Sequence, residues 1–385
     1  MSYHRRVSFA VYLLILLSLL AVTLPAIGAP SFAASEISLA GIVQASFPNS
    51  IQFNINAQSD SSITDLRLHY IVEKQNYAAV VSEAQPVFQP SKSVSTGWAW
   101  DMRKSALPVG ASLEYWWTAA DSSGKTAETQ RNTYTFSDER YKWQSITTEP
   151  VTIYWYKGSA SFANTLMAAA QKGLKKIGND TGAISQGKVK LFIYASSQDL
   201  QGAHLFAPQW EGGVHFTGYG IIAIGIAPDE LSWGERAVPH ELTHWVIGQV
   251  TFNNYGAGLP VWLDEGLATY GEGQLLSDYQ SALNSAVKSN RLFSVKSLSS
   301  PFSAVPVEAY ISYGQSNSIV TFMIQKFGKD KMIQLLNVFK EGSGYDEALQ
   351  QVYGFDQDGL DKLWRESLDI KTGMNKSGSV ILVSR

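Results

Sequence analysis

Alternating apolar and polar residues dominate the chain from about residue 36 to 137 and predict β-strands. Ile51, Phe53 and Ile55 alternate with polar neighbours, which is the period-two pattern of a half-buried strand. The same alternation recurs at 66–70 and 113–117, with turn residues between such segments. Because no helical pattern interrupts these strands, we expect residues 36–140 to form an all-β, immunoglobulin-like sandwich.

The pattern changes after the polar run at 137–142, and residues 141–370 predict an α+β domain. Apolar strands are expected at 151–155, 189–194 and 220–227, and an amphipathic helix at 162–177. The 220–227 segment reads equally well as a buried central strand and as an edge that pairs with an extended peptide. Further on, apolar residues at 319–327 and 360–368 have helical spacing, and the last fifteen residues, 371–385, form a polar tail.

The first 35 residues predict export. Arg5 and Arg6 precede an almost wholly apolar run at 7–27, and small residues follow, with Ser31 and Ala33 at the −3 and −1 positions of a cleavage site. The alternative is an uncleaved membrane anchor, since the run is long enough to span a bilayer. Both interpretations predict a protein that is secreted or held on the extracytoplasmic face of the membrane.

Composition narrows the possible functions. Hydrophobic residues make up 45% of the 385 residues and the formal net charge is −3, so nothing suggests a nucleic-acid partner. Cysteine is absent, which excludes disulfides, thiolate metal ligands and cysteine nucleophiles. Any metal site must therefore use His, Asp or Glu.

One segment brings such residues together, at His240-Glu241-Leu-Thr-His244. Residues four apart lie on one face of a helix, so both imidazoles can reach a single zinc ion, with Glu241 as general base. Pro239 suits a first helical position or a kink. The third ligand is expected from the carboxylates Asp264 and Glu265, which spacing alone cannot separate.

These strings resemble the gluzincin metallopeptidases, which include thermolysin and the membrane alanyl aminopeptidases. Trp262-Leu-Asp-Glu265-Gly-Leu-Ala is similar to the aminopeptidase string that carries the third zinc ligand, and this resemblance implies Glu265. The closest resemblance is to the bacterial peptidase MA-like group and covers roughly residues 145–370, including the string from Tyr313. It implies a thermolysin-like peptidase domain with one zinc ion per chain. The Gly-x-Met-Glu-Asn string of the aminopeptidases is absent, so the resemblance does not imply an aminopeptidase.

Two further roles, the oxyanion donor and the partner that positions a histidine, have several candidates each. An oxyanion donor is expected among Tyr313, Tyr310, His215 and His204, and the resemblance favours Tyr313. A positioning partner for a ligating histidine is expected among Thr269, Glu235 and Asp264.

The sequence thus predicts an exported zinc peptidase that acts on a peptide or protein substrate, with catalytic Glu241 and Tyr313. The alternatives are a surface binding protein with an inactive zinc domain and a zinc hydrolase of a non-peptide substrate. The intact set of Glu241 and expected ligands argues against the inactive form. Neither the oligomeric state nor the role of the β domain follows from the sequence.

Overall fold

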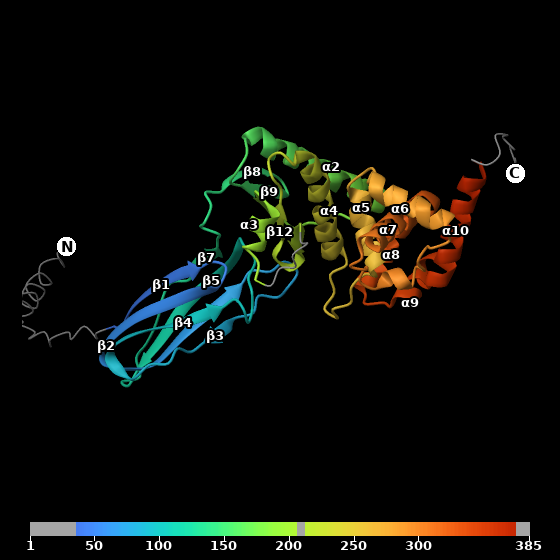
Figure 1. Ribbon diagram of the computed structural model, residues 1–385. Helices are drawn as coiled ribbons and strands as arrows, with labels where there is room; N and C mark the ends of the chain where they lie inside the picture. Colours follow the sequence, from blue (N-terminus) through green and yellow to red (C-terminus); the bar gives the residue numbers. More distant parts are fainter. Residues whose placement is uncertain (1–35, 206–211, 375–385) are drawn as a thin grey trace, which may run out of the picture.

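A computed structural model describes residues 36–205 and 212–374 of the chain, with side chains as far as residue 368. The described part is elongated, with a β-rich region at one end, a mixed sheet and its helices in the middle, and a helical region at the other end (Figure 1). The predicted export signal at 1–35 and residues 375–385 of the predicted tail lie outside the described residues. No helix in the described ranges is long and apolar enough to cross a membrane.

The β-rich region confirms the predicted all-β character. Its apolar residues alternate because one side of each strand faces the core and the other faces solvent. Fully buried Phe53 and Ile55, for example, flank the partly exposed Asn54. The seven strands are β1 (Ser38–Ser46), β2 (Ser50–Val72), β3 (Ser82–Ala84), β4 (Ser91–Asp101), β5 (Ala111–Asp121), β6 (Thr126–Glu128) and β7 (Asn132–Phe136).

Hydrogen bonds join all seven strands in one sheet, and the predicted immunoglobulin-like sandwich of two separate sheets is not confirmed. Strand β2 is the reason, because it is a single 23-residue strand where the sequence predicts two. Its first half pairs with β1 and β4 and its second half with β3 and β5, with an irregularity between Gln58 and Ile63. The sheet folds over its own core there, so that Phe53 of the first half meets Tyr115 of β5 at 5.3 Å between ring centroids.

The middle of the molecule holds a second, five-stranded sheet with the order β11-β12-β10-β9-β8. Its three inner strands run parallel and the two outer strands antiparallel. Both faces of β12 are covered, which explains its continuous apolar run. The strands are β8 (Gln144–Thr148), β9 (Val151–Trp155), β10 (Val189–Tyr194), β11 (Gly213–Phe216) and β12 (Ile221–Gly225).

This order decides between the two interpretations of the 220–227 segment. Strand β12 has neighbours on both sides, so the buried central strand is the one observed. The outer strand beside it is β11, which the sequence did not predict.

The polar run between the two sheets is a packed junction. Asp138 is fully buried and accepts two hydrogen bonds from the Arg140 guanidinium, at 2.8 and 2.7 Å, and one from the Tyr194 hydroxyl at 3.1 Å. Phe192 and Tyr194, on the outer face of β10, pack with the core of the β-rich region. Because apolar residues from both sides share this core, the domain boundary at 140/141 stays a prediction.

Helices cover the other face of the five-stranded sheet and continue into the helical region (Figure 1). The expected helix at 162–177 is found with longer ends, and the last helix extends four residues into the predicted tail. The helices are α2 (Ala160–Thr181), α3 (Ser197–Gln201), α4 (Leu231–Val250), α5 (Val261–Gly271), α6 (Ser277–Lys288), α7 (Pro306–Phe327), α8 (Lys329–Lys340), α9 (Tyr345–Tyr353) and α10 (Gln357–Met374), with the short 3-10 helices η1 (Thr217–Tyr219) and η2 (Ser297–Ser299).

Candidate active site

Helix α4 carries both histidines of the His-Glu-x-x-His string. It begins at Leu231, so Pro239 lies inside the helix and the expectation of a first helical position is wrong. Proline has no N–H to donate at this position, so one hydrogen bond of the helix is lost there, and packing against α2 supports the helix instead. A Cβ added at Gly173 of α2 would lie 2.7 Å from the Cβ of Pro239, so only glycine lets the two helices approach this closely. This contact fixes the turn that presents His240.

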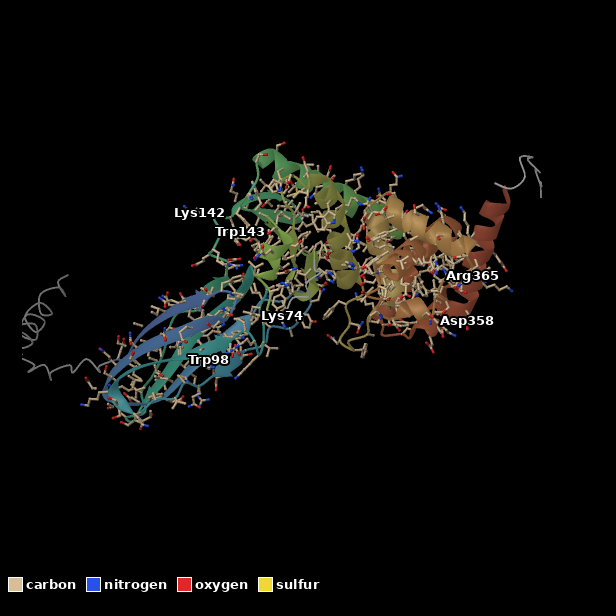
Figure 2. The ribbon with its side chains drawn as sticks, in the orientation of Figure 1. Lys74, Trp98, Lys142, Trp143, Asp358 and Arg365 are labelled. Carbon is tan, nitrogen blue, oxygen red and sulfur yellow. The ribbon has the colours of Figure 1, made fainter. Side chains whose placement is uncertain are left out.

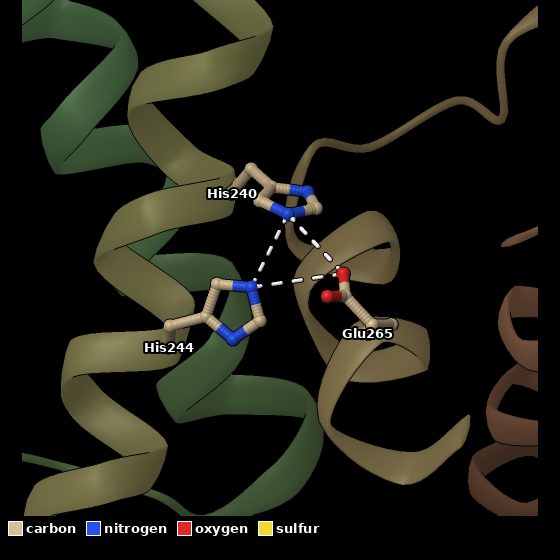
Figure 3. A group of neighbouring side chains, drawn as sticks. All are labelled: His240, His244 and Glu265. Carbon is tan, nitrogen blue, oxygen red and sulfur yellow. Dashed lines mark hydrogen bonds and ion pairs between the residues drawn. The ribbon is translucent and has the colours of Figure 1, made fainter. Parts of the chain in front are cut away.

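Three donor atoms converge between α4 and α5 (Figure 3). The Nε2 atoms of His240 and His244 lie 3.2 Å apart. Oε2 of Glu265 lies 3.5 Å from the first and 3.7 Å from the second. The structure therefore brings together the three residues that the sequence predicts as metal ligands.

The spacing of these atoms fits a zinc ion. Zinc binds nitrogen and oxygen ligands at about 2.0–2.2 Å in a tetrahedron, whose donor atoms are then separated by roughly 3.3–3.6 Å. The three observed separations lie close to this range. In addition, Oε2 of Glu265 is buried and accepts no hydrogen bond from the described residues. A buried carboxylate oxygen without a partner is costly, and a cation would satisfy it.

The opposite ring nitrogens of both histidines contact carboxylates. Nδ1 of His244 lies 3.0 Å from Asp264, and Nδ1 of His240 lies 2.8 Å from Glu272. A proton held on Nδ1 by a carboxylate leaves the lone pair of Nε2 free for a metal. Arg236 in turn donates to Glu272 at 2.6 Å and holds that carboxylate in place.

These contacts distinguish the candidates that the sequence left open. Asp264 makes the contact with His244 that is expected of a positioning partner, and the converging donor atoms include Glu265 and not Asp264. Thr269 donates to the backbone carbonyl of Glu265 instead of a histidine. Glu235, the third candidate, is exposed on α4. Glu272 was missed, although it follows Glu265 by seven residues and so lies two helical turns along the same face.

The carboxylates dominate the electrostatics of the site. Burial alone would lower the pKa of His244, but the charge and hydrogen bond of Asp264 outweigh it and raise that pKa to about 9. Burial likewise opposes protonation of His240, whose pKa is nevertheless raised by the neighbouring carboxylates of Glu265 and Glu272. For Glu241, burial acts to raise the pKa, and the neighbouring histidines bring it below the usual value. The site thus favours positive charge at the imidazoles and an ionised Glu241.

The side chain of Glu241 is held by strand β11. Its Oε2 lies 3.3 Å from Nδ1 of His215, and the His215 ring stacks on His244 with centroids 4.6 Å apart. A Cβ added at Gly213 would lie 2.8 Å from Oε1 of Glu241, so the strand backbone passes close beside the carboxylate. His215 is thereby in direct contact with Glu241, the expected general base. From the sequence, His215 is considered only as an oxyanion donor, and this contact is not predicted.

The tyrosines expected as oxyanion donors lie in the second turn of α7. Tyr313 is largely buried and stacks on Tyr279 of α6, with ring centroids 5.3 Å apart. Burial raises its pKa, and the charges of Glu265 and Glu241 add to the effect, so its hydroxyl is within electrostatic range of the donor cluster. Tyr310 is 41% exposed and meets Tyr279 edge to face, with ring centroids 5.3 Å apart. His204, the last candidate, packs against Phe216 of β11.

Several solved structures match parts of the chain weakly. Wild-type OgpA from Akkermansia muciniphila matches with a TM-score of 0.21 and 14% identity over 26% of this chain and 27% of that chain. Catalytically inactive OgpA in complex with an O-glycopeptide substrate matches with a TM-score of 0.20 and 14% identity over 26% and 29%. The sporulation control protein Spo0M from Bacillus subtilis matches with a TM-score of 0.19 and 10% identity over 36% and 55%. The matched part spans little more than a quarter of OgpA, and no curated protein matches.

The family comparison is decisive. A family model described as the Peptidase MA superfamily matches residues 169–370, which is more than half of the chain. This range includes α4, α5 and α7 and therefore the whole donor cluster. It also confirms the resemblance seen in the sequence. The chain belongs to the Peptidase MA superfamily.

Proposed function

We propose that this protein is an exported zinc-dependent peptidase that hydrolyses peptide bonds. The observation that carries the proposal is the convergence of the His240, His244 and Glu265 donor atoms at the spacing of a tetrahedral zinc site, next to an ionised Glu241. When bound, zinc would polarise a scissile carbonyl and lower the pKa of a water molecule from 15.7 toward about 7.

Within this proposal, the residues of the chain divide the remaining work. Glu241 takes a proton from the attacking water and delivers it to the leaving amine, for which its ionised resting state is suited. Asp264 and Glu272 hold the two imidazoles with their Nε2 atoms toward the metal. Tyr313 donates a hydrogen bond to the oxyanion that forms as water adds to the carbonyl.

The location of the protein is also a proposal. The basic start, the apolar run at 7–27 and the small residues that follow support export, with cleavage after Ala33. A peptidase of this kind would then act on peptides or proteins outside the cytoplasm.

The proposed function is tested by Glu241→Gln, which keeps the size of the side chain and removes the base. We expect one zinc per chain in both proteins and a turnover at least about 10²-fold lower in the variant on a mixed peptide library. Glu235→Gln, on the same helix, is the matched control and keeps its activity. Equal turnover in Glu241→Gln and the parent would contradict the role of this residue. Zinc-loaded parent protein that cleaves no peptide would contradict the peptidase itself.

A further inference from the structure

A cleft of about 300 Å³ lies beside the donor cluster, and the β-rich region forms part of its wall. His215, His244 and Asp264 line the cleft next to the metal site, while Gln75 and Tyr77 line it from the loop between β2 and β3. That loop ends at residue 81, and α4 begins 150 residues later, at Leu231. The cleft is therefore assembled from both regions of the molecule.

The β2–β3 loop is firmly held in this position. The backbone N–H of Gln75 donates to the carbonyl of Gly218 at 2.6 Å, and its side-chain oxygen accepts from the indole N–H of Trp245 at 3.3 Å. Asn76 donates to Gln249 of α4 at 2.5 Å. Lys74, at the junction of the two regions (Figure 2), lies over the rings of Tyr77 and Tyr219 at 5.5 and 5.2 Å.

Glycines on the opposite side leave room for the loop. A Cβ added at Gly220 would overlap with the side-chain amide of Gln75, and one added at Gly218 would lie 3.2 Å from the ring of Tyr77. A side chain at either position would have to displace the side chain of Gln75 or Tyr77 from where it lies. The peptidase part is thus shaped to receive this segment of the β-rich region.

The chemistry of the cleft indicates what it can bind. Tyr77 is 54% exposed and meets Phe252 edge to face, with ring centroids 4.8 Å apart. Small residues of the α4–α5 loop form the other side, and a Cβ added at Gly256 or Gly258 would meet no atom within 4 Å. The carboxylate of Asp264 is the only acidic group lining the cleft within the described residues, and it is engaged by His244.

We propose that this cleft is a substrate subsite completed by the β-rich region, and that it accepts a bulky uncharged side chain with an aromatic ring. The ring packs against the pair formed by Tyr77 and Phe252, since aromatic side chains favour offset and edge-to-face contacts. The subsite rests on the proposed peptidase function and gives the β-rich region a role in selecting the substrate.

The test measures binding, so that it does not depend on turnover. The full chain carrying Glu241→Gln is loaded with zinc and titrated with fluorescent nine-residue peptides of Ala and Gly that contain one central Phe, one central Lys or neither. We expect the Phe peptide to bind about tenfold more tightly than the plain peptide. Adding Tyr77→Ala should remove most of this preference, whereas Val87→Ala, at an exposed position of the same region, should leave it intact.

Phe252→Ala provides a second variant on the facing side of the cleft and should have the same effect as Tyr77→Ala. An unchanged Phe preference in both variants would overturn the subsite, as would tightest binding of the Lys peptide. The proposed function is measured separately, by cleavage with the parent chain. If the parent cleaves nothing but the Phe preference depends on Tyr77, the subsite stands and the peptidase function fails.

Discussion

Replacing Asp264 by Asn should change the pH dependence of zinc affinity more than it changes the zinc affinity at neutral pH. Asp264 raises the pKa of His244 to about 9, and a protonated imidazole cannot bind a metal. At pH 7, about two units below this pKa, His244 of the parent is mostly protonated, so zinc must displace a proton from it. This displacement weakens binding by about 10²-fold, or about 2.7 kcal/mol.

The same carboxylate also strengthens binding, because it orients the imidazole and makes it a better ligand, an effect typically of about 10–100-fold. Asp264→Asn removes both effects at once. Near pH 7 they oppose each other, since the variant loses the positioning but also loses much of the proton competition. The raised pKa acts only below about pH 9 and its penalty disappears as the pH rises through that value. Near pH 9 only the lost positioning remains.

Zinc affinity is measured by competition with a chromophoric chelator between pH 6.5 and 9, for the parent, Asp264→Asn and the surface control Asp278→Asn. The affinity of the parent should rise with pH more steeply than that of Asp264→Asn, so that the two are similar at pH 7 and differ by about 10–100-fold at pH 9. The pKa of His240 is raised by Glu265, Glu272 and Glu241, which all three proteins retain. A ratio that stays constant across the pH range would refute the reasoning.

Three further predictions follow from the site and the export signal. Glu265→Ala should lose most of the bound zinc by metal analysis, because it removes one of three donor atoms, whereas Thr269→Ala, which loses only a backbone contact, should retain it. Tyr313→Phe should lower kcat by about 10²–10³-fold with unchanged zinc content and thermal stability, while Tyr310→Phe stays near the parent; a loss of stability with an unchanged rate would instead mark Tyr313 as structural. Mass spectrometry of the mature protein should find an amino terminus near Ala34, and an intact Met1 in a membrane fraction would indicate an anchor instead.

The sequence by itself determined the parts of the site that are encoded locally. The spacing of His240 and His244 places both rings on one helical face, and the resemblance around Glu265 selects it over its neighbour Asp264. The apolar strands of the central sheet and the apolar faces of the long helices could be predicted for the same reason. Periods of two and of about 3.6 residues follow directly from strand and helix geometry.

The tertiary structure alone decided which residues from distant segments meet. His215 reaches Glu241 because β11 lies at the edge of the sheet beside α4, and Gln75 reaches the cleft from the β-rich region. The single long β2, which joins seven strands in one sheet, also depends on pairing between distant strands. Such contacts leave no periodic signal in the chain, because they depend on how whole elements pack and not on spacing within one element.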